Sequence, residues 1–241
     1  MGRIAVVTGG TRGIGAAIAR TLLESGYKVA VTYHNNETAA QAFRQETGIP
    51  AYQWDVADYA ACESGVRQIE TDLAGPVEIL INNAGITRDT TLHKMNPAQW
   101  NDVITTNLTS CFNMCRLTID DMRANGFGRV VNIGSINGQA GQYGQVNYAA
   151  AKSGIHGFTK ALAQEGAAKN VTVNAIAPGY VETDMVRAVP ANVLEKIVAK
   201  IPVGRLGKVS DIARAVLFLV ADDADFITGS TLSVNGGQHM Y

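Results

Sequence analysis

Short apolar runs and longer amphipathic stretches alternate along almost the whole chain. The apolar runs have the length of β-strands, and they lie at Arg3–Thr8, Lys28–Tyr33, Ala51–Trp54, Glu78–Asn82, Gly128–Ile133, Val171–Ala177 and Thr231–Val234. Between them, a helical pattern covers Gly15–Ser25, Glu37–Thr47, Ala60–Leu73, Trp100–Ala124, Tyr148–Lys169 and Ser210–Ala221. Parallel strands need long crossover connections, so this alternation predicts an α/β fold with a parallel sheet covered by helices on both faces.

The alternation breaks once, between residues 178 and 207. This stretch holds three of the six prolines and one short helical pattern near Ala191–Lys200. A long connection in a compact domain usually serves as a lid or a binding loop, so we predict that residues 178–207 bind the substrate. Because no repeat, low-complexity tract or linker divides the chain, we expect a single domain over residues 1–241.

Composition and charge narrow the function classes. The formal net charge is −1, which gives no indication of a nucleic-acid or membrane partner. The most apolar window, near Ala213–Ala221, is too short to span a bilayer, and we see no targeting segment at the N-terminus. The odd set of Cys62, Cys111 and Cys115 suggests reduced thiols in a cytoplasmic protein. Cys111 and Cys115 lack further ligands at metal-binding spacing, so we predict no metal site.

A glycine-rich turn joins the first predicted strand to the first predicted helix. In VVTGGTRGIGAAIA, Gly9, Gly13 and Gly15 fall where the strand gives way to the helix. Glycine at these positions allows a tight turn and a close backbone approach to a pyrophosphate, which then lies at the positive end of the helix. At this place in a βαβ unit, the turn predicts a dinucleotide site.

The end of the second predicted strand indicates which dinucleotide binds. NAD-specific sites place a carboxylate there, which binds the ribose 2′-hydroxyl and repels a 2′-phosphate. This chain instead has Thr32, Tyr33, His34 and Asn35. The first acid, Glu37, is explained by first-turn helix chemistry after an Asn cap. Arg12, in the glycine turn, is placed to pair with a phosphate, so we predict NADP(H).

Three further polar positions follow later strands or interrupt a helix. Asp55 is placed to accept a hydrogen bond from the adenine amino group, or else to cap the next helix. The run Ile79–Gly85 ends with two asparagines at the carboxyl edge of the sheet, where such amides need hydrogen-bond partners. Asn107 interrupts a long predicted helix, where it either makes a satisfied kink or holds a water that relays protons.

The stretch with the clearest chemistry runs from Ser135 to Lys152. Tyr148 and Lys152 are four residues apart on a predicted helix, so their side chains lie on one face. An ammonium beside a phenol favours the phenolate and would lower the tyrosine pKa. Ser135, at the end of the preceding strand, can hydrogen-bond the reacting oxygen. The three residues predict proton transfer to a carbonyl or from an alcohol, although YxxxK alone also occurs by chance.

Taken together, these segments resemble the classical short-chain dehydrogenase/reductases. The resemblance rests on TGGTRGIG, NNAG, Asn107, Ser135, YAAAK and PGYVETDM, and it covers essentially the whole chain. It implies a seven-stranded, doubly wound Rossmann sheet, usually in a homotetramer. The family's catalytic tetrad falls on Asn107, Ser135, Tyr148 and Lys152. By that analogy Tyr148 is the general acid in reduction, Ser135 polarises the carbonyl, Lys152 binds the nicotinamide ribose and Asn107 anchors a relay water.

The resemblance also implies a set of cofactor contacts. Val181 and Thr183 would touch the nicotinamide carboxamide. The full set expected to contact NADP(H) is Gly9, Thr11, Arg12, Gly13, Ile14, Gly15, Tyr33, Asp55, Val56, Asn83, Ala84, Gly85, Tyr148, Lys152, Pro178, Gly179, Val181 and Thr183.

Within the family, the chain is most similar to reductases of short 3-oxoacyl thioesters. The segments NNAGITRDTTLHKM and GQAGQYGQ and the ending SVNGGQHMY favour a substrate carried on coenzyme A. The implied reaction is NADPH-dependent reduction of acetoacetyl-CoA to (R)-3-hydroxybutanoyl-CoA, as in polyhydroxybutyrate synthesis. The expected substrate contacts are Asp89, Lys94, Ser135, Gln142, Tyr143, Gln145, Tyr148 and Tyr180. Gln142 and Gln145 have an alternative role, which is to satisfy the backbone of their own loop.

Two other functions remain open at this point. A substrate on acyl carrier protein, as in fatty-acid synthesis, would need a basic docking patch, for which Arg129 and Lys169 are candidates or else ordinary surface charges. A non-catalytic NADP(H) sensor on the same fold is the more remote alternative, because such proteins commonly lose the Tyr or the Lys that this chain keeps.

Overall fold

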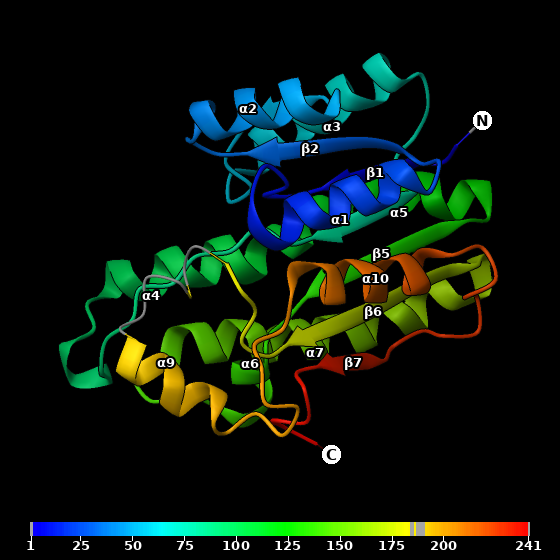
Figure 1. The fold of residues 1–241 in the computed structure, drawn as a ribbon. Helices are drawn as coiled ribbons and strands as arrows, with labels where there is room; N and C mark the ends of the chain where they lie inside the picture. Colours follow the sequence, from blue (N-terminus) through cyan, green and yellow to red (C-terminus); the bar gives the residue numbers. More distant parts are fainter. Residues whose placement is uncertain (1, 184–185, 187–190, 241) are drawn as a thin grey trace.

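The computed structural model contains one sheet of seven parallel strands in the order β3-β2-β1-β4-β5-β6-β7 (Figure 1). It describes residues 2–183, 186 and 191–240. The strands are β1 (Ile4–Val7), β2 (Lys28–Tyr33), β3 (Ala51–Gln53), β4 (Ile79–Asn82), β5 (Gly128–Ile133), β6 (Val171–Pro178) and β7 (Thr231–Val234). The predicted doubly wound Rossmann fold is therefore confirmed, with small differences at the strand ends.

Helices cover both faces of this sheet. They are α1 (Gly13–Glu24), α2 (Glu37–Thr47), α3 (Tyr59–Leu73), α4 (Pro97–Ile104), α5 (Ser110–Asn125), α6 (Ile136–Ala140), α7 (Val146–Gly166), α9 (Ala191–Val198) and α10 (Val209–Val220). Short 3₁₀ turns lie at Leu92–Lys94 and Ala167–Lys169. The prediction missed α6 and the turn at Leu92–Lys94, because both are too short to show a helical period.

The prediction of one uninterrupted helix over Trp100–Ala124 is wrong. The helical segment begins earlier, at Pro97, where Asn96 and Gln99 form a reciprocal capping box. A π-helical turn at Thr105–Thr109 then separates α4 from α5, with the Ser110 amide donating to the Thr105 carbonyl. Such wide turns inside α-helices often occur at functional sites, and this one contains Asn107.

Two layers of apolar side chains hold the helices to the sheet. Successive residues of a strand point to opposite faces, and in β4 Ile79 and Ile81 pack with α1, α2 and α10 while Leu80 packs with α3 and α5. Strand β5 repeats this pattern, with Val130 on the α3–α5 side and Val131 on the other. Because both faces are buried, the strands read as nearly continuous apolar runs.

The amino edge of the sheet contains a buried arginine that the sequence analysis had placed in a surface patch. Arg129 is 0% exposed. Its guanidinium donates to the backbone carbonyls of Gly128, Asn170, Ala221 and Asp222. The proposed docking role of Arg129 is therefore wrong, because a side chain enclosed in this way cannot meet a partner protein. Lys169 is exposed, as an ordinary surface charge would be.

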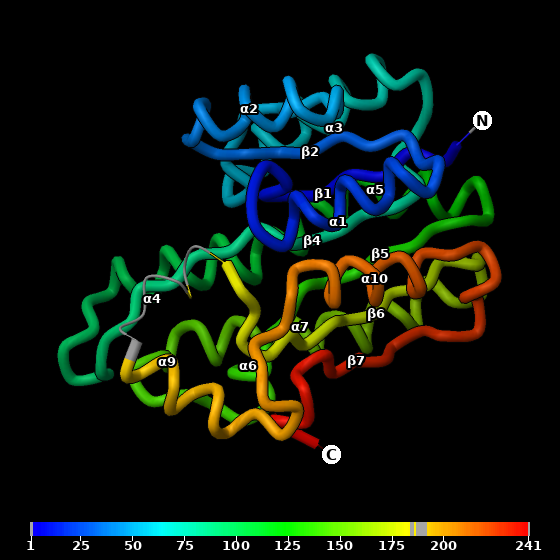
Figure 2. The backbone as a smooth tube through the Cα atoms, viewed as in Figure 1, coloured from blue at the N-terminus to red at the C-terminus, as the bar shows by residue number. Residues whose placement is uncertain are grey.

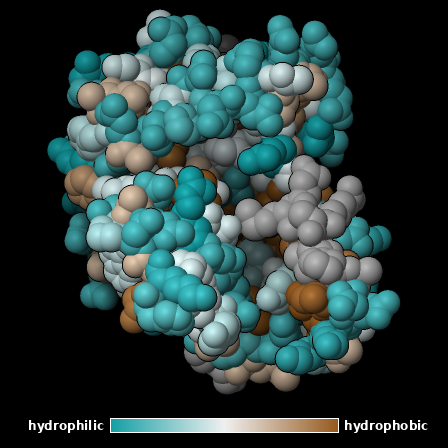
Figure 3. All heavy atoms as spheres, turned by 90° about the vertical axis from the view of Figure 1, so that its left-hand side faces the viewer, coloured by the Kyte–Doolittle hydropathy of each residue, from teal (hydrophilic) through white to brown (hydrophobic). Residues whose placement is uncertain are grey.

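The opposite, carboxyl edge collects the connections that the sequence analysis associated with function. The order of strands reverses between β1 and β4, which leaves a crevice beyond their carboxyl ends. Figure 3 views this edge and shows that it is hollowed. The tube in Figure 2 shows that α9 and the C-terminal end of the chain lie on this side, near α6. The predicted loop 178–207 also belongs here, but residues 184–185 and 187–190 lie outside the described part of the chain.

Candidate active site

The glycine turn has the backbone geometry that the sequence analysis expected. Gly9 and Gly13 have φ angles of 63° and 55°, in the left-handed region that favours glycine. At Gly15, a Cβ atom would lie 2.4 Å from the Gly9 carbonyl oxygen and 2.5 Å from Asn83 Nδ2. Only a residue without a side chain fits there, so the first turn of α1 packs directly against the ends of β1 and β4.

Thr8 and Asn83 hold that turn in place. The Thr8 hydroxyl accepts hydrogen bonds from the Asn83 and Ala84 amides at 2.9 and 3.0 Å. The Asn83 side chain donates to the Thr8 and Gly9 carbonyls at 2.8 and 3.1 Å. The neighbouring Asn82 donates to Asn132 at 2.8 Å. Both asparagines therefore have the partners that the sequence analysis required, and the ends of three strands are locked together.

The end of β2 carries a tyrosine whose hydroxyl is already engaged. Tyr33 is buried, and its hydroxyl donates to Glu37 and accepts from Arg44. Arg44 also binds the other oxygen of Glu37 and the Ala51 carbonyl. Hydrogen bonds from Tyr33 and then Arg44 lower the pKa of Glu37. Glu37 is thus ionised but paired with an arginine, which reduces its repulsion of a phosphate.

Arg12 and His34 are the basic side chains left accessible near the glycine turn. Arg12 is exposed at the N-cap of α1, where its side chain makes no capping bond. His34 lies 3.8 Å from Asp55, measured between Nε2 and Oδ2. The alternative role of Asp55 as a helix cap is wrong, because Asp58 caps α3 and Asp55 instead accepts from the Ala57 amide. Asp55 keeps one carboxylate oxygen directed toward this region.

Asn107 is buried inside the π-helical turn, and both its amide oxygen and its amide nitrogen are hydrogen-bonded. Its Oδ1 accepts from the Ile86 amide at 2.8 Å, and its Nδ2 donates to the Ile86 carbonyl at 2.9 Å. A Cβ atom on Gly85 would lie 3.3 Å from Asn107 Oδ1 and 3.7 Å from Lys152 Nζ. The side chain thus fixes the segment after β4, and Asn107 lies next to the catalytic lysine candidate.

Ser135, Tyr148 and Lys152 come together at the ends of β5 and the start of α7. Lys152 is 4% exposed, and its Nζ donates to the Ile133 carbonyl at 2.7 Å. The same nitrogen lies 5.7 Å from the centre of the Tyr148 ring. Ser135 is also buried, and its hydroxyl caps α6 by accepting from the Asn137 amide. The predicted proximity of the three side chains is therefore present in the fold.

The ionisation of this group differs from the expectation for Tyr148. Burial raises the pKa of Tyr148, the hydrogen bond with Ser135 lowers it in part, and the charge of Asp89 raises it again. Burial also lowers the pKa of Lys152 to about 8. The expected depression of the phenol pKa by Lys152 is not found, because desolvation dominates for both groups. A tyrosine with a raised pKa stays protonated, which suits a proton donor.

The segment after β6 reaches back toward the glycine turn. Pro178 ends β6, and Gly179 packs so closely on Asn235 that a Cβ atom would lie 2.8 Å from the Asn235 Cα. Val181 is buried and pairs with Gly207 in an isolated bridge. A Cβ atom on Gly13 would lie 3.7 Å from the Thr183 methyl group. Gly13 and Thr183, which are both expected to contact the cofactor, therefore lie close to one another.

The loop between α6 and α7 is tied to the segment that follows β4. Gln145 accepts from Asn137 at 2.8 Å and donates to Asp89 at 2.7 Å. The Thr90 amide donates to the Gly144 carbonyl at 2.9 Å. Neither the predicted substrate contact nor the alternative of satisfying its own loop describes Gln145 fully, because its side chain links two separate segments beside Tyr148.

The remaining predicted substrate residues differ in their exposure. Tyr143 is 87% exposed, and Gln142 and Lys94 are exposed as well. Tyr180 is half-buried, and burial followed by the charge of Asp89 raises its pKa. Gln142 and Tyr180 line a cavity of about 370 Å³. The structure therefore places Gln142 and Tyr180 together, whereas Lys94 and Tyr143 project from the surface.

Comparison with known proteins shows the family to which this chain belongs. A family model described as enoyl-(acyl carrier protein) reductase matches residues 9–239. The acetoacetyl-CoA reductase of Rhizobium meliloti (strain 1021) is 63% identical over 241 residues, covering 100% of both chains. The chain belongs to the short-chain dehydrogenase/reductase family. It is an oxidoreductase, and the Rossmann fold of this family implies a nicotinamide cofactor.

Other members of the short-chain dehydrogenase/reductase family match the chain over nearly the same length. The acetoacetyl-CoA reductase of Shinella zoogloeoides is 61% identical, covering 99% of each chain. The 3-oxoacyl-[acyl-carrier-protein] reductase of Escherichia coli (strain K12) is 47% identical, covering 99% of this chain and 98% of that one. Both relatives are similar along the full fold, so the substrate must be argued from the site.

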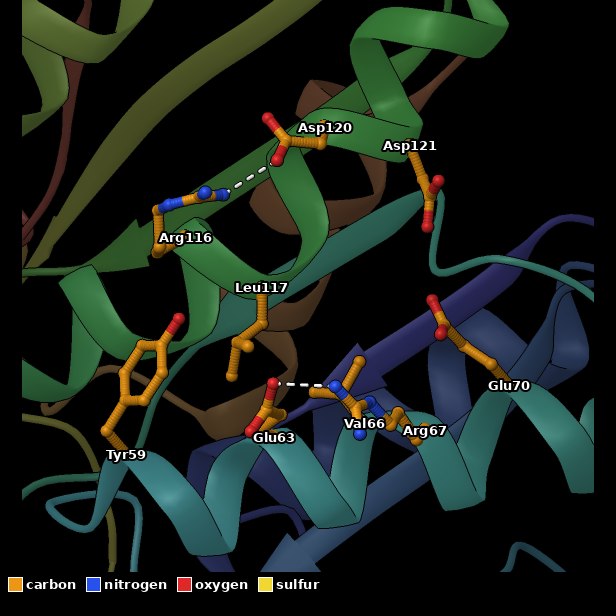
Figure 4. Close-up of a pocket in the computed structure, with 9 residues that line it drawn as sticks. All are labelled: Tyr59, Glu63, Val66, Arg67, Glu70, Arg116, Leu117, Asp120 and Asp121. Atoms are coloured by element: carbon orange, nitrogen blue, oxygen red, sulfur yellow. Dashed lines mark hydrogen bonds and ion pairs between the residues drawn. The ribbon is translucent and has the colours of Figure 1, made fainter.

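A second cavity, of about 330 Å³, lies between α3 and α5 and does not belong to the family's site (Figure 4). Its charged side chains pair within their own helices, Arg67 with Glu63 and Arg116 with Asp120. Glu70 and Asp121 lie at its other end, where burial and the charge of Asp121 raise the pKa of Glu70. The described residues include no group of three or more His, Cys, Asp or Glu side chains able to hold a metal ion.

The sequence analysis of this dehydrogenase/reductase missed Thr8 and Asn147. Asn147 is 0% exposed, donates to the Arg88 and Gln99 carbonyls, and accepts from the Tyr148 amide. It therefore fixes the start of α7 at the catalytic tyrosine candidate. Its position one residue before Tyr148 was visible in the sequence, but its burial was not. Among the described residues, no helix is long and apolar enough to cross a membrane.

Proposed function

We propose that this protein catalyses the NADPH-dependent reduction of acetoacetyl-CoA to (R)-3-hydroxybutanoyl-CoA, a step in polyhydroxybutyrate synthesis. The observation that carries the proposal is the full-length similarity, at 58–63% identity, to proteins named acetoacetyl-CoA reductase. It is supported by the convergence of Asn107, Ser135, Tyr148 and Lys152 at the carboxyl edge of the sheet.

The glycine turn fits a dinucleotide. The left-handed glycines leave the first turn of α1 open, and a side chain on Gly13 would fill the gap toward Thr183. In this proposal the backbone amides at the start of α1 bind the pyrophosphate, and the segment from Pro178 to Thr183 holds the nicotinamide end. When bound, the cofactor supplies a hydride to the β-carbon of the substrate.

The catalytic residues then have separate tasks. Ser135 donates a hydrogen bond to the 3-oxo oxygen and orients it. Tyr148, kept protonated by its raised pKa, donates its proton to that oxygen as charge develops on it. Lys152 holds the ribose and its positive charge stabilises the resulting phenolate. Asn107 fixes the segment after β4 and anchors the water through which Tyr148 regains a proton.

We further propose that the cofactor is NADP(H) rather than NAD(H). Arg12 is exposed beside the turn, and His34 lies at the end of β2. Glu37, which would repel a 2′-phosphate, is paired with Arg44. Arg12 thus supplies a cation that the 2′-phosphate can bind, and Tyr33 with Asp55 and Val56 lines the adenosine end of the site.

Coenzyme A is proposed as the carrier in preference to acyl carrier protein. Docking of an acyl carrier protein needs a basic surface patch, and Arg129 cannot belong to one because it is buried. Gln142 and Tyr180 instead line a cavity of about 370 Å³, where amide and phenol groups can bind a pantetheine arm. Asp89, Lys94, Tyr143 and Gln145 complete the proposed substrate surface.

The assembly is proposed to be a homotetramer of single NADP-binding domains over residues 1–241, with residues 178–207 as the substrate loop. Apolar side chains on and near α10 and β7 support association of copies: Phe226 is 100% exposed and Phe218 is 56% exposed. All three cysteines are free and buried, which supports a cytoplasmic location.

The function is tested by steady-state rates with acetoacetyl-CoA and acetoacetyl-carrier protein, each with NADPH and NADH. We expect a higher kcat/KM for the CoA thioester with NADPH. The variant Arg12→Ala should raise KM for NADPH by about tenfold or more and leave KM for NADH nearly unchanged, because only NADPH carries the 2′-phosphate. Arg20→Ala, on the outer part of α1, is the matched control. A preference for the carrier-protein substrate would replace this proposal with the fatty-acid reductase.

A further inference from the structure

The cavity of about 370 Å³ beside Tyr180 has a basic wall that the catalytic account does not use. Lys196 and Lys200 line it from α9 and the residues just after that helix. On the other sides lie Gln142, Tyr180 and the side chain of Gln238 near the C-terminus. The cavity therefore brings together four segments of the chain, at the carboxyl edge of the sheet (Figure 1).

The two lysines form a local excess of positive charge. They are four residues apart, so their side chains emerge on the same side of the helical segment. Within the described part of the chain, neither ammonium forms an ion pair with a carboxylate. Two unpaired cations at the rim of one cavity favour an anionic ligand.

Gln238, which also lines this cavity, gives an independent observation. Its Oε1 atom is buried and accepts no hydrogen bond from any described residue. A buried amide oxygen without a donor is uncommon, because its desolvation is uncompensated. The ligand that fits this cavity therefore carries N–H donors as well as negative charge.

Coenzyme A combines these two features in the required order. Its pantetheine arm contains two amide N–H groups, and its ADP portion carries a diphosphate and a 3′-phosphate at the far end of that arm. Tyr180 directly follows Gly179, and Gln142 belongs to the loop that Gln145 ties to Asp89. The cavity is thus lined by the segment after Pro178 and by the loop that precedes α7, the helix of Tyr148, and its opposite wall carries the two lysines.

We propose that Lys196 and Lys200 bind the phosphate groups of coenzyme A, while Gln238 accepts a hydrogen bond from an amide of the pantetheine arm. This inference rests on the proposed function and adds the residues by which the enzyme distinguishes a CoA thioester from a shorter thioester. Because the lysines are not among the proposed proton-transfer residues Ser135, Tyr148 and Lys152, they contribute to KM and leave the chemical step unchanged.

The test compares acetoacetyl-CoA, acetoacetyl-dephospho-CoA and acetoacetyl-pantetheine as substrates with NADPH. The double variant Lys196→Gln/Lys200→Gln should raise KM for acetoacetyl-CoA about tenfold and lower kcat by less than twofold. Its KM for acetoacetyl-pantetheine, which has no phosphate, should change by less than twofold. Acetoacetyl-dephospho-CoA keeps the diphosphate and lacks the 3′-phosphate. If the double variant raises KM for this substrate less than for acetoacetyl-CoA, the lysines bind the 3′-phosphate in part. If the two KM values rise equally, the lysines bind the diphosphate.

A control pair and a second variant make the result specific. Lys160→Gln/Lys169→Gln removes two exposed lysines elsewhere and should leave KM for every substrate unchanged. Gln238→Leu should raise KM severalfold for acetoacetyl-CoA and acetoacetyl-pantetheine alike, since both contain the amides. The wild-type KM for acetoacetyl-CoA should also rise with salt more steeply than that for acetoacetyl-pantetheine.

The outcomes separate this inference from the proposed function. If the wild-type enzyme reduces acetoacetyl-CoA but the lysine variant has unchanged KM values, the lysines are ordinary solvated charges and the inference is wrong. Equal losses on acetoacetyl-CoA and acetoacetyl-pantetheine would also overturn it, because the effect would not follow the phosphates. If the wild-type enzyme reduces none of the thioesters, the proposed function itself fails.

Discussion

The two edges of the sheet each enclose one cationic side chain, and the two cations are treated in opposite ways. At the amino edge, Arg129 is 0% exposed and donates to four backbone carbonyls, with its guanidinium 4.3 Å from the centre of the Phe127 ring. At the carboxyl edge, Lys152 is 4% exposed and donates to the carbonyl of Ile133 alone among the described residues. Both side chains are buried, but Arg129 has many more hydrogen-bond partners than Lys152.

This difference separates a structural cation from a chemical one. Arg129 joins the start of β5 to the residues that follow α7 and α10, so its charge is compensated by fixed dipoles. Lys152 has N–H donors without a partner among the described residues, and its Nζ lies near Tyr148 and Gly85. A buried cation with free donors costs stability, and in this fold that cost is located where a ligand and a proton are expected to meet.

The largest effect is expected from removing the proton donor at the carboxyl edge. Tyr148→Phe deletes one hydroxyl group and keeps the ring, so binding of NADPH should remain nearly intact. We expect kcat to fall on the order of 10³-fold, because general acid catalysis is lost. The measurement is kcat with saturating acetoacetyl-CoA, with cofactor binding followed by fluorescence. A variant that keeps more than about a tenth of the wild-type rate would remove Tyr148 from its role.

The next effect concerns stability at the amino edge. Arg129→Met removes the guanidinium donor from four carbonyl groups, of which those of Asn170 and Ala221 keep a backbone donor. We expect the free energy of unfolding to fall by about 2–4 kcal/mol, because two buried acceptors are left without a partner. Denaturant unfolding measures this change, and KM values of the folded fraction should be unaffected. Arg116→Met is the matched control, because the Arg116–Asp120 pair is solvated and its loss should leave the free energy of unfolding nearly unchanged. Similar losses in the two variants would show that Arg129 is not a structural anchor.

Lys152→Met should instead raise the free energy of unfolding. Since the pKa of Lys152 is about 8 in the folded protein and 10.5 for the free side chain, the unfolded chain binds more protons between these values. The free energy of unfolding therefore rises with pH from about 8 to 10.5. Below pH 8, burial of the charged Lys152 destabilises the folded protein by about 3 kcal/mol. Loss of the bond to Ile133 offsets about 1 kcal/mol of the gain.

We accordingly expect Lys152→Met to be inactive but more stable by about 1–3 kcal/mol at pH 7, with the difference shrinking toward pH 10. Unfolding curves at several pH values measure it, and Lys160→Met, an exposed site on the same helix, serves as control. A variant less stable than wild type at pH 7 would mean that Lys152 is satisfied in the same way as Arg129.

The smallest effect is expected where the carboxyl edge is held together by the hydrogen bonds of one side-chain amide. Gln145→Ala removes the link between Asn137 and Asp89 and should lower kcat/KM for acetoacetyl-CoA roughly tenfold, about 1.4 kcal/mol. The exposed Gln164, further along α7, provides the control as Gln164→Ala. An unchanged kcat/KM would indicate that the loop keeps its position without this side chain.

The sequence predicted the carboxyl edge better than the amino edge. Strands, most helices and the placement of Ser135, Tyr148 and Lys152 follow from period and spacing, which are local properties. The need for glycine at positions 9 and 13 was also predictable, because a tight turn between a strand and a helix needs residues without a side chain. The family was confirmed by comparison, while the cofactor preference and the individual site residues stay predictions.

The failures have a common physical cause. Arg129 was placed on the surface because a single charged residue does not reveal which carbonyls will surround it. The raised pKa of Tyr148 depends on burial, which spacing on a helix does not report. The π-helical turn around Asn107 and the role of Asp58 instead of Asp55 as a cap depend on shifts of one to three residues. Each property arises from tertiary packing and not from local pattern.

The most direct test of the account is chiral analysis of the product formed by the wild-type enzyme from acetoacetyl-CoA and NADPH, with crotonyl-CoA as the competing substrate. We predict one equivalent of (R)-3-hydroxybutanoyl-CoA for each NADPH oxidised and no reduction of crotonyl-CoA, because the donor side chains at the carboxyl edge serve an oxygen and not a carbon–carbon double bond. Reduction of crotonyl-CoA in place of acetoacetyl-CoA, or formation of the (S) product, would contradict the account.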